Sequence, residues 1–288
     1  MNINWYPGHM AKTRRLITEN LKLVDIVVEL LDARIPHSSK NPDIDNIVNN
    51  KPRLAVFNKV DLADDKVTEE WIKYYKEKNI NVVCINARDG KGTEKISTEI
   101  NKILSEKINK YTEKGMNYNI KMMIVGIPNV GKSSLINKLA KKSSAKTGDK
   151  PGVTKGKQWV RIQKGLELLD TPGILWPKFE DPEVGKNLAL TGAIKDEILD
   201  TLELSCMLLN YLKREYPDNL KERYKVEFDK DIPDYDLLLM IGKKRGFIIS
   251  GGEIDDERTA KMLLDETRGL KLGKISFEKP YQSQNEES

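Results

Sequence analysis

The sequence lacks the residues and runs that mark several classes of protein. Its 288 residues include only 2 cysteines and 2 histidines, which argues against a disulfide framework and against a Cys/His metal cluster. No apolar run approaches the roughly 18 residues of a membrane-spanning helix, and the opening residues lack the apolar core of a signal peptide. We therefore predict a cytoplasmic protein with no membrane association, and we interpret Cys84 and Cys206 as buried, reduced thiols.

A strong charge of either sign is also missing. The chain has 49 Lys and Arg against 44 Asp and Glu, a formal net charge of +5, which is compatible with a nucleic-acid partner without establishing one. With 39% hydrophobic and 32% charged residues, the composition is that of a globular rather than a disordered chain. The length allows one α/β nucleotide-binding domain and a second, smaller domain.

Short apolar runs alternate with helical patterns through most of the first 178 residues. The runs have the continuous character of buried parallel strands, and they lie at residues 24–31, 53–57, 81–85 and 120–125. Helical spacing between them predicts an α/β fold with a mostly parallel sheet and helices on both faces. A turn at Lys164 and Gly165 predicts a hairpin formed by residues 158–162 and 167–169.

Beyond Pro177 the pattern changes to helices alone. Apolar residues recur at helical spacing over residues 186–213 and 255–268. We therefore divide the chain into an α/β domain, residues 1–178, and a small all-helical domain, residues 179–288, whose last dozen residues form a disordered tail. The leucines expected to form the core of this helical bundle are Leu202, Leu208, Leu209 and Leu212.

A phosphate-binding loop follows the fourth apolar run. Residues 126–133 read GIPNVGKS, a full GxxxxGK[ST] motif between a predicted strand and a predicted helix, as the motif requires. Its backbone N–H groups would surround the β-phosphate at a helix N-terminus. Lys132 would bind the β- and γ-phosphates, and the Ser133 hydroxyl would bind Mg²⁺. The predicted nucleotide contacts in this loop are Asn129, Val130, Gly131, Lys132, Ser133 and Ser134.

Two later segments supply the other phosphate-sensing residues. Residues 170–173 read DTPG, in which Asp170 would hold Mg²⁺ through water and the Gly173 N–H would contact the γ-phosphate. Thr154, in a glycine-rich basic loop, is the candidate for the threonine that binds Mg²⁺ only when the γ-phosphate is present. Thr147 is the alternative.

A guanine-recognition box lies near the second apolar run. Residues 58–61 read NKVD, and the Asp61 carboxylate can accept hydrogen bonds from guanine N1–H and from the exocyclic amine, neither of which adenine offers. Asn58 would bond the guanine edge and brace the loops, while the Lys59 stem would lie over the base. Asn86 and Ala87 follow the third run, where the Ala87 N–H can reach guanine O6. Together the motifs predict binding of GTP and GDP with Mg²⁺.

The order of these motifs is inverted. An ordinary GTPase begins with the phosphate loop, whereas here the guanine box at 58–61 precedes the loop at 126–133. The same sheet can form only if the ordinary termini are joined, and the polar segment 109–119 is the natural joint. New ends then open after DTPG, so that this switch leads directly into the helical domain, a short path from nucleotide state to a partner-binding surface.

This arrangement resembles the circularly permuted Ras-like P-loop GTPases, and more closely the ribosome biogenesis GTPase A (RbgA, or YlqF) family. The resemblance covers nearly the whole chain and also rests on WYPGHM at residues 5–10 and DARIP at residues 32–36. It implies a cytoplasmic GTPase that binds a late precursor of the large (50S) ribosomal subunit, contacts its rRNA and is stimulated by it. We expect a monomer that binds in the GTP state and leaves on hydrolysis. The family's usual opening has phenylalanine where this chain has Tyr6.

The glutamine that orients water in Ras-like enzymes is missing. Its position after DTPG holds Ile174, which cannot hydrogen-bond water, so intrinsic hydrolysis should be slow. His9 is the catalytic candidate because histidine titrates near neutrality and because the resemblance points to it; the alternative is that it packs or touches RNA. His37 reads as an ordinary loop residue. The resemblance also suggests that Asn129 helps to coordinate K⁺; the alternative is a loop asparagine bonding its own backbone.

Basic residues recur in the helical domain among acidic ones. Phosphate contacts from them would give salt-dependent RNA binding, and a solvated mixed-charge helix face is the alternative. A rival function, an RNA-modification factor or a regulator not acting on ribosomes, would need a further catalytic domain or a lipid anchor, and no motif for either is visible. The basic residues are Lys243, Lys244, Arg245, Arg258, Lys261, Arg268, Lys271 and Lys274.

Overall fold

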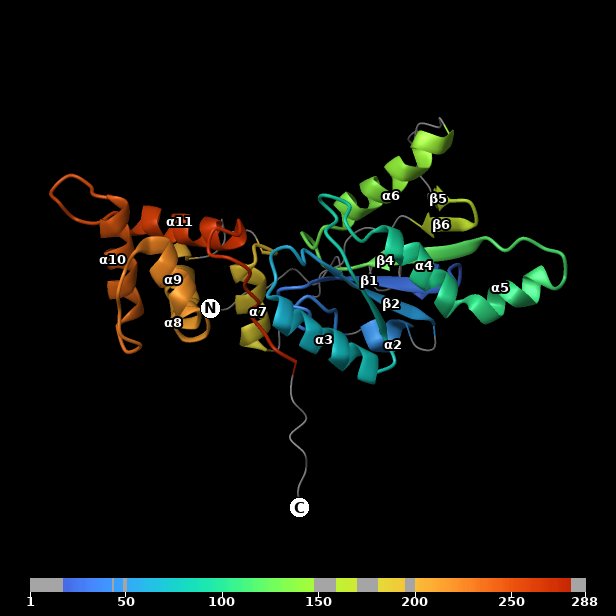
Figure 1. Cartoon of the computed structure of the whole chain (residues 1–288), viewed down its shortest axis with the longest axis horizontal. Coiled ribbons are helices and arrows are strands. Elements are labelled where there is room, and N and C mark those ends of the chain that lie inside the picture. Colours follow the sequence, from blue (N-terminus) through green and yellow to red (C-terminus); the bar gives the residue numbers. More distant parts are fainter. Residues whose placement is uncertain are drawn as a thin grey trace, which may run out of the picture.

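A six-stranded sheet forms the centre of the N-terminal part of the chain (Figure 1). The computed structural model describes residues 18–42, 44–48, 51–147, 159–169, 181–194 and 200–280. The strand order is β3-β2-β1-β4-β6-β5, and neighbouring strands are parallel except β6 and β5, which form the predicted hairpin. The strands are β1 (Ile26–Asp32), β2 (Arg53–Asn58), β3 (Asn81–Cys84), β4 (Ile120–Val125), β5 (Trp159–Gln163) and β6 (Leu166–Leu169).

The inverted motif order is visible in the sheet. Strand β4, which leads into the phosphate loop, pairs with β1, which comes first among the strands. The joint predicted at residues 109–119 overlaps the end of helix α5 (Ser105–Thr112). Hydrogen bonds hold this region beside the start of β1. There the Asp25 carboxylate accepts hydrogen bonds from Lys107 Nζ and the Tyr118 hydroxyl, both at 2.6 Å.

Helices cover both faces of the sheet, as predicted. All residues of β1 are buried, and alternate side chains meet different helices. Ile26, Val28 and Leu30 pack on the side of α4 and α6, whereas Val27 and Leu31 pack on the side of α2 and α3. A strand buried on both faces reads as a continuous apolar run for this reason. The helices are α2 (Ile44–Val48), α3 (Asp65–Glu77), α4 (Glu94–Ile103) and α6 (Lys132–Thr147).

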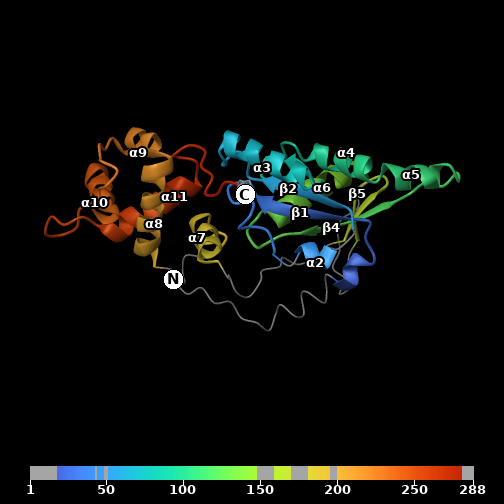
Figure 2. The ribbon, with the colours of Figure 1, turned by 90° about the horizontal axis from the view of Figure 1, so that it is seen from below.

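The C-terminal part is helical, and in both views α7 lies between it and the sheet (Figures 1 and 2). Of the predicted core leucines, Leu208, Leu209 and Leu212 on α8 are fully buried, whereas Leu202 is half-buried and packs against the core. No helix among the described residues is long and apolar enough to cross a membrane. The boundary near residue 178 lies outside the described residues and stays a prediction. The helices are α7 (Pro182–Leu190), α8 (Thr201–Glu215), α9 (Pro217–Tyr224), α10 (Asp234–Arg245) and α11 (Asp256–Arg268).

An extended segment, residues 272–280, returns from the helical part to the sheet, and we call it the strap. Figure 1 shows it in red, leaving the helical group and passing α7 toward α3. Ile275 and Phe277 are only 2% and 6% exposed. The prediction of a disordered tail over the last dozen residues was wrong at its start, because Phe277 and Glu278 hydrogen-bond to the sheet part and Lys279 pairs with Glu215 of the helical part. Residues 281–288 lie outside the described residues.

Candidate nucleotide-binding site

The phosphate loop joins β4 to the N-terminus of α6, as its sequence predicts. A Cβ at Gly126 would lie 2.7 Å from the Leu30 carbonyl oxygen, so only glycine allows the loop to pass β1. Gly131 has φ +100°, and a Cβ there would lie 2.2 Å from Asn58 Nδ2. The glycines thus bring the loop against the guanine box, and α6 begins at Lys132, so that the positive end of its helix dipole faces the loop.

Asn58 holds three distant segments together. Its Nδ2 donates to the Val130 carbonyl at 2.7 Å, and its Oδ1 accepts from the Ala87 N–H at 2.9 Å. The residue is 3% exposed, so these bonds are shielded from water. The guanine box, the phosphate loop and the loop that contains Asn86 and Ala87, which we call the alanine loop, therefore meet at one side chain.

The Ala87 N–H, which we predict to reach guanine O6, donates to Asn58 Oδ1 at 2.9 Å. Its contact with guanine stays a prediction, and it would have to share or replace this bond. The neighbouring Asn86 shapes the turn, because its Oδ1 accepts from Arg88 N–H at 2.9 Å and from Asp89 N–H at 3.2 Å. The alanine loop is therefore held by hydrogen bonds within the protein. The sequence motif alone does not reveal that Asn58 Oδ1 is an acceptor for the Ala87 N–H.

Lys59 is held by a carboxylate that the sequence did not single out as a site residue. Lys59 has φ 62°, and its Nζ lies 2.9 Å from Asp32 Oδ2. Arg34 Nη2 reaches the same oxygen at 2.8 Å. Although burial acts to raise it, these two cations hold the pKa of Asp32 well below its usual range. The sequence did offer one sign of this role, because Asp32 is an acidic residue at the end of β1, the strand beside the one that ends in the guanine box.

Asp61 and the two serines after Lys132 are accessible. Asp61 is partly exposed, and Ser133 and Ser134 are exposed in the first turn of α6. A hydroxyl at this place suits Mg²⁺ as an oxygen ligand. Within the described ranges, no group of three His, Cys, Asp or Glu could hold a metal ion by itself, so Ser133 would need ligands from elsewhere.

Asn129 bonds a segment that is distant in the sequence. It has φ 59°, and its Nδ2 donates to the Ala193 carbonyl at 3.1 Å. This bond occupies the amide nitrogen. It leaves open both the predicted contact of the amide oxygen with K⁺ and the alternative that this oxygen bonds the loop's own backbone.

Several predicted site residues lie outside the described residues: His9, Thr154, Asp170, Gly173 and Ile174. Their roles stay predictions. Thr147, the alternative to Thr154, is the last residue of α6. His37 lies in the loop after β1, and burial lowers the pKa of its imidazole.

Comparisons with known proteins find relatives over nearly the whole chain. The model of a protein family described as "50S ribosome-binding GTPase" matches residues 121–238. Ribosome biogenesis GTPase A from Bacillus cereus is 54% identical over 282 residues, which cover 97% of this chain and 95% of that protein. The chain belongs to the ribosome biogenesis GTPase A family. The protein of this name from Thermotoga maritima is 32% identical over 278 residues, covering 96% of this chain and 95% of that protein.

Solved structures extend the likeness to the fold of this ribosome biogenesis GTPase A family member. YlqF from Thermotoga maritima, solved with GDP bound and with GNP bound, matches with a TM-score of 0.64 and 28% identity in each case. The matches cover 92% and 94% of this chain and 99% of YlqF. The fold is that of a circularly permuted Ras-like GTPase, and residues 121–238 accordingly contain the phosphate loop but not the guanine box.

Some basic residues of the helical part of this family member are engaged within the protein. Arg268 donates from Nε to the Leu190 carbonyl at 3.0 Å and from Nη2 to the Ala189 carbonyl at 2.8 Å. It therefore joins α11 to the end of α7 and is committed to that junction. Lys274 forms an ion pair with Asp65 at 2.6 Å.

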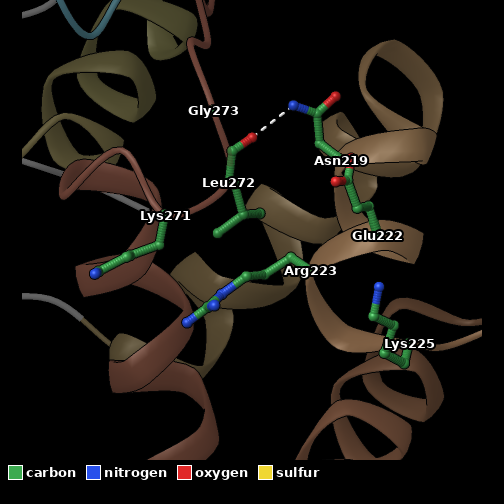
Figure 3. A pocket seen from close by; sticks show the side chains of 7 residues that line it. All are labelled: Asn219, Glu222, Arg223, Lys225, Lys271, Leu272 and Gly273. Carbon is green, nitrogen blue, oxygen red and sulfur yellow. Dashed lines mark hydrogen bonds between the residues drawn. The ribbon is translucent and has the colours of Figure 1, made fainter.

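A basic cavity of about 470 Å³ lies in the helical part (Figure 3). Arg223, Lys225 and Lys271 line it together with one carboxylate, Glu222. Arg223 is held by Glu266, at 2.9 Å between Nε and Oε2. The lining is net positive, which suits an anionic group such as a phosphate.

Proposed function

We propose that this chain binds GTP at the permuted site and uses its hydrolysis to time a late step in the assembly of the large ribosomal subunit. One observation carries the guanine-nucleotide part of the proposal. Asn58 joins the guanine box to the phosphate loop and the alanine loop through bonds of 2.7 and 2.9 Å. The three motifs of a guanine-nucleotide site meet there although the chain visits them in inverted order.

Each part of the site would contribute one kind of contact. The loop amides and Lys132 would bind the phosphates, and Asp61 would accept from the guanine N1–H and amine. Ser133, with Thr154 and Asp170, would hold Mg²⁺, which when bound supplies positive charge that stabilises the negative phosphates. Lys59, fixed by its 2.9 Å ion pair with Asp32, would present its stem to the base.

Hydrolysis would need a group in place of the missing glutamine. Ile174 cannot orient water, so His9 is our catalytic candidate, and a K⁺ ion held with the help of Asn129 would add positive charge beside the phosphates. Comparison of GTP turnover in KCl and NaCl tests the role of K⁺, because equal rates would contradict it. The variant His9→Ala tests the role of the histidine, because an unchanged rate of GTP hydrolysis in the presence of the partner would contradict it.

The partner is proposed from charge and from the family. The matching family is described as binding the 50S ribosome, and the relatives are named for ribosome biogenesis. In this chain Lys225 and Lys271, which line the cavity, would contact rRNA phosphates. The protein would act in the cytoplasm as a monomer, engaging precursor particles with GTP and leaving after hydrolysis.

Co-sedimentation with large-subunit precursors tests the partner. We expect association with a non-hydrolysable GTP analogue, little with GDP, and a steep loss as salt is raised. Charge reversal at Lys225 and Lys271 should weaken the association, whereas Lys230→Glu, on the exposed loop after α9, is the matched control. GTP hydrolysis without any binding to ribosomal particles would favour the rival, a regulator or RNA-modification factor.

A further inference from the structure

The strap contacts the loop that follows the guanine box. The Ile275 N–H donates to the Leu62 carbonyl at 2.9 Å, and Leu62 is the residue after Asp61. The Ser276 hydroxyl accepts from the Asp64 N–H at 3.1 Å. The Asp64 side chain in turn caps α3 by accepting from Lys66 N–H at 2.8 Å. The backbone on the C-terminal side of Asp61 is therefore fixed by the strap.

The strap also contacts the loop that follows β1. The Phe277 N–H donates to the Arg34 carbonyl at 2.9 Å. The Glu278 carboxylate accepts from the Ser38 N–H at 3.0 Å and from Asn187 Nδ2 at 3.2 Å. This loop begins at Asp32, which holds Lys59. Thus the strap supports the segments behind both Asp61 and Lys59.

Two tyrosines of the helical part hold the strap at Ser276. The Tyr211 hydroxyl, on α8, donates to the Ser276 carbonyl at 2.6 Å. The Tyr216 hydroxyl donates to the same carbonyl at 3.2 Å and accepts from the Ser276 N–H at 3.1 Å. Ser276 is therefore bonded at once to the helical domain and to the loop beside the guanine box.

We propose that the strap is a positioning element of the guanine site, through which the helical domain sets the affinity for guanine nucleotides. The inference rests on the proposed assignment of Asp61 and Lys59 to the base. Because the strap supports the base-binding residues and not the γ-phosphate, it affects GDP and GTP alike. By linkage, a partner that displaces α8 from the strap changes nucleotide affinity by the factor with which nucleotide changes the partner's affinity. This path is separate from the covalent one through the DTPG segment.

The double variant Tyr211→Phe, Tyr216→Phe tests the inference in the full chain. It removes the hydroxyls and keeps the rings, so the packing of Tyr211 on Phe277 at 5.5 Å is retained. We expect affinity for both GDP and a non-hydrolysable GTP analogue to fall by about 5- to 30-fold, with their ratio unchanged. Tyr235→Phe is the matched control, since its hydroxyl bonds Asp256 at 2.8 Å, away from the strap, and should leave both affinities as they were.

A comparison of GDP with IDP separates positioning from general loosening. IDP lacks the exocyclic amine that Asp61 would bind, so a misplaced Asp61 should narrow the preference for GDP over IDP, whereas a merely less stable protein should keep it. Ser276→Ala, which removes one bond to Asp64, should give a smaller change in the same direction if the double variant does not fold.

Unchanged GDP affinity in the folded double variant would overturn the inference, as would a loss confined to the GTP analogue. Asp61→Asn tests the proposed guanine site separately. It should weaken GDP and favour xanthosine diphosphate, whose C2 carbonyl accepts where guanine donates. If Asp61→Asn binds GDP as the unmodified chain does, the guanine assignment fails, whatever the tyrosine variants do.

Discussion

Strand β1 carries two buried carboxylates whose surroundings differ. Glu29, in the middle of the strand, is 2% exposed, and neither of its oxygens has a hydrogen-bond partner within the part of the chain that the structure describes. Burial raises the pKa of Glu29 to about 7, although Arg53 lies 3.7 Å away. Asp32, at the end of the strand, is as deeply buried but has Arg34 at 2.8 Å and Lys59 at 2.9 Å.

The difference separates the core of the sheet from its functional edge. Removing a carboxylate from water is unfavourable unless charges and hydrogen bonds replace the water. At Glu29 no hydrogen bonds from the described residues replace the water, so the carboxyl group keeps its proton up to a pH of about 7. At Asp32 charges and hydrogen bonds do replace the water, and the ionised group organises Lys59 beside the proposed guanine site. Burial alone therefore does not tell which carboxylate belongs to a site; its partners do.

The largest effect is expected at the functional edge, from Asp32→Asn. The change leaves the buried guanidinium of Arg34 without its carboxylate, so we expect a loss of about 3–5 kcal/mol in the free energy of unfolding. Urea unfolding at neutral pH measures it. Glu227→Gln is the control, because its pair with Lys221 is exposed, at 89% for the Glu227 side chain, and should cost less than about 1 kcal/mol. Similar losses in both variants would remove the contrast.

A pH series on Glu29→Gln sharpens the other half of the comparison. The pKa of Glu29 is about 7 in the folded chain against an ordinary value of 4.5, so the folded chain binds more protons than the unfolded chain between these pH values. Its contribution therefore makes the protein less stable as pH rises from about 4.5 through 7, by up to roughly 3 kcal/mol. Glu29→Gln should lose this decline while Arg53, Lys40 and Asp45 remain. An equally steep decline in the variant would contradict the assignment.

A third carboxylate, Asp25, lies just before β1 and should give the smallest effect. Tyr118→Phe removes the hydroxyl that donates to Asp25 at 2.6 Å, and we expect a loss of about 0.5–1.5 kcal/mol in the free energy of unfolding. Lys107→Ala should cost still less, because Lys107 is 44% exposed. Thermal unfolding measures both. A loss as large as that of Asp32→Asn would mean that the joint, and not the functional edge, depends most on its charges.

Much of the fold could be predicted because it depends on local sequence patterns, such as apolar runs and short motifs. The continuous apolar run that became β1 and the GIPNVGKS loop were recognisable within a few residues of sequence. The partners of Ala87 and Asp32 were not, because they depend on loops brought together by strand pairing. Glu278 was missed for the same reason: its polar neighbours suggested a tail, yet it bonds Ser38 across 240 residues of sequence.

The strap also has a consequence for the order in which the protein is made. Ser276 is synthesised 212 residues after Asp64, the residue whose N–H it accepts, and long after the phosphate loop. A chain still attached to the translating ribosome can form the central strands first. The loop after the guanine box lacks its bonds to the strap until the end of the chain has been made. If the strap positions the guanine site as proposed, a growing chain would acquire full nucleotide affinity only after the helical domain has folded.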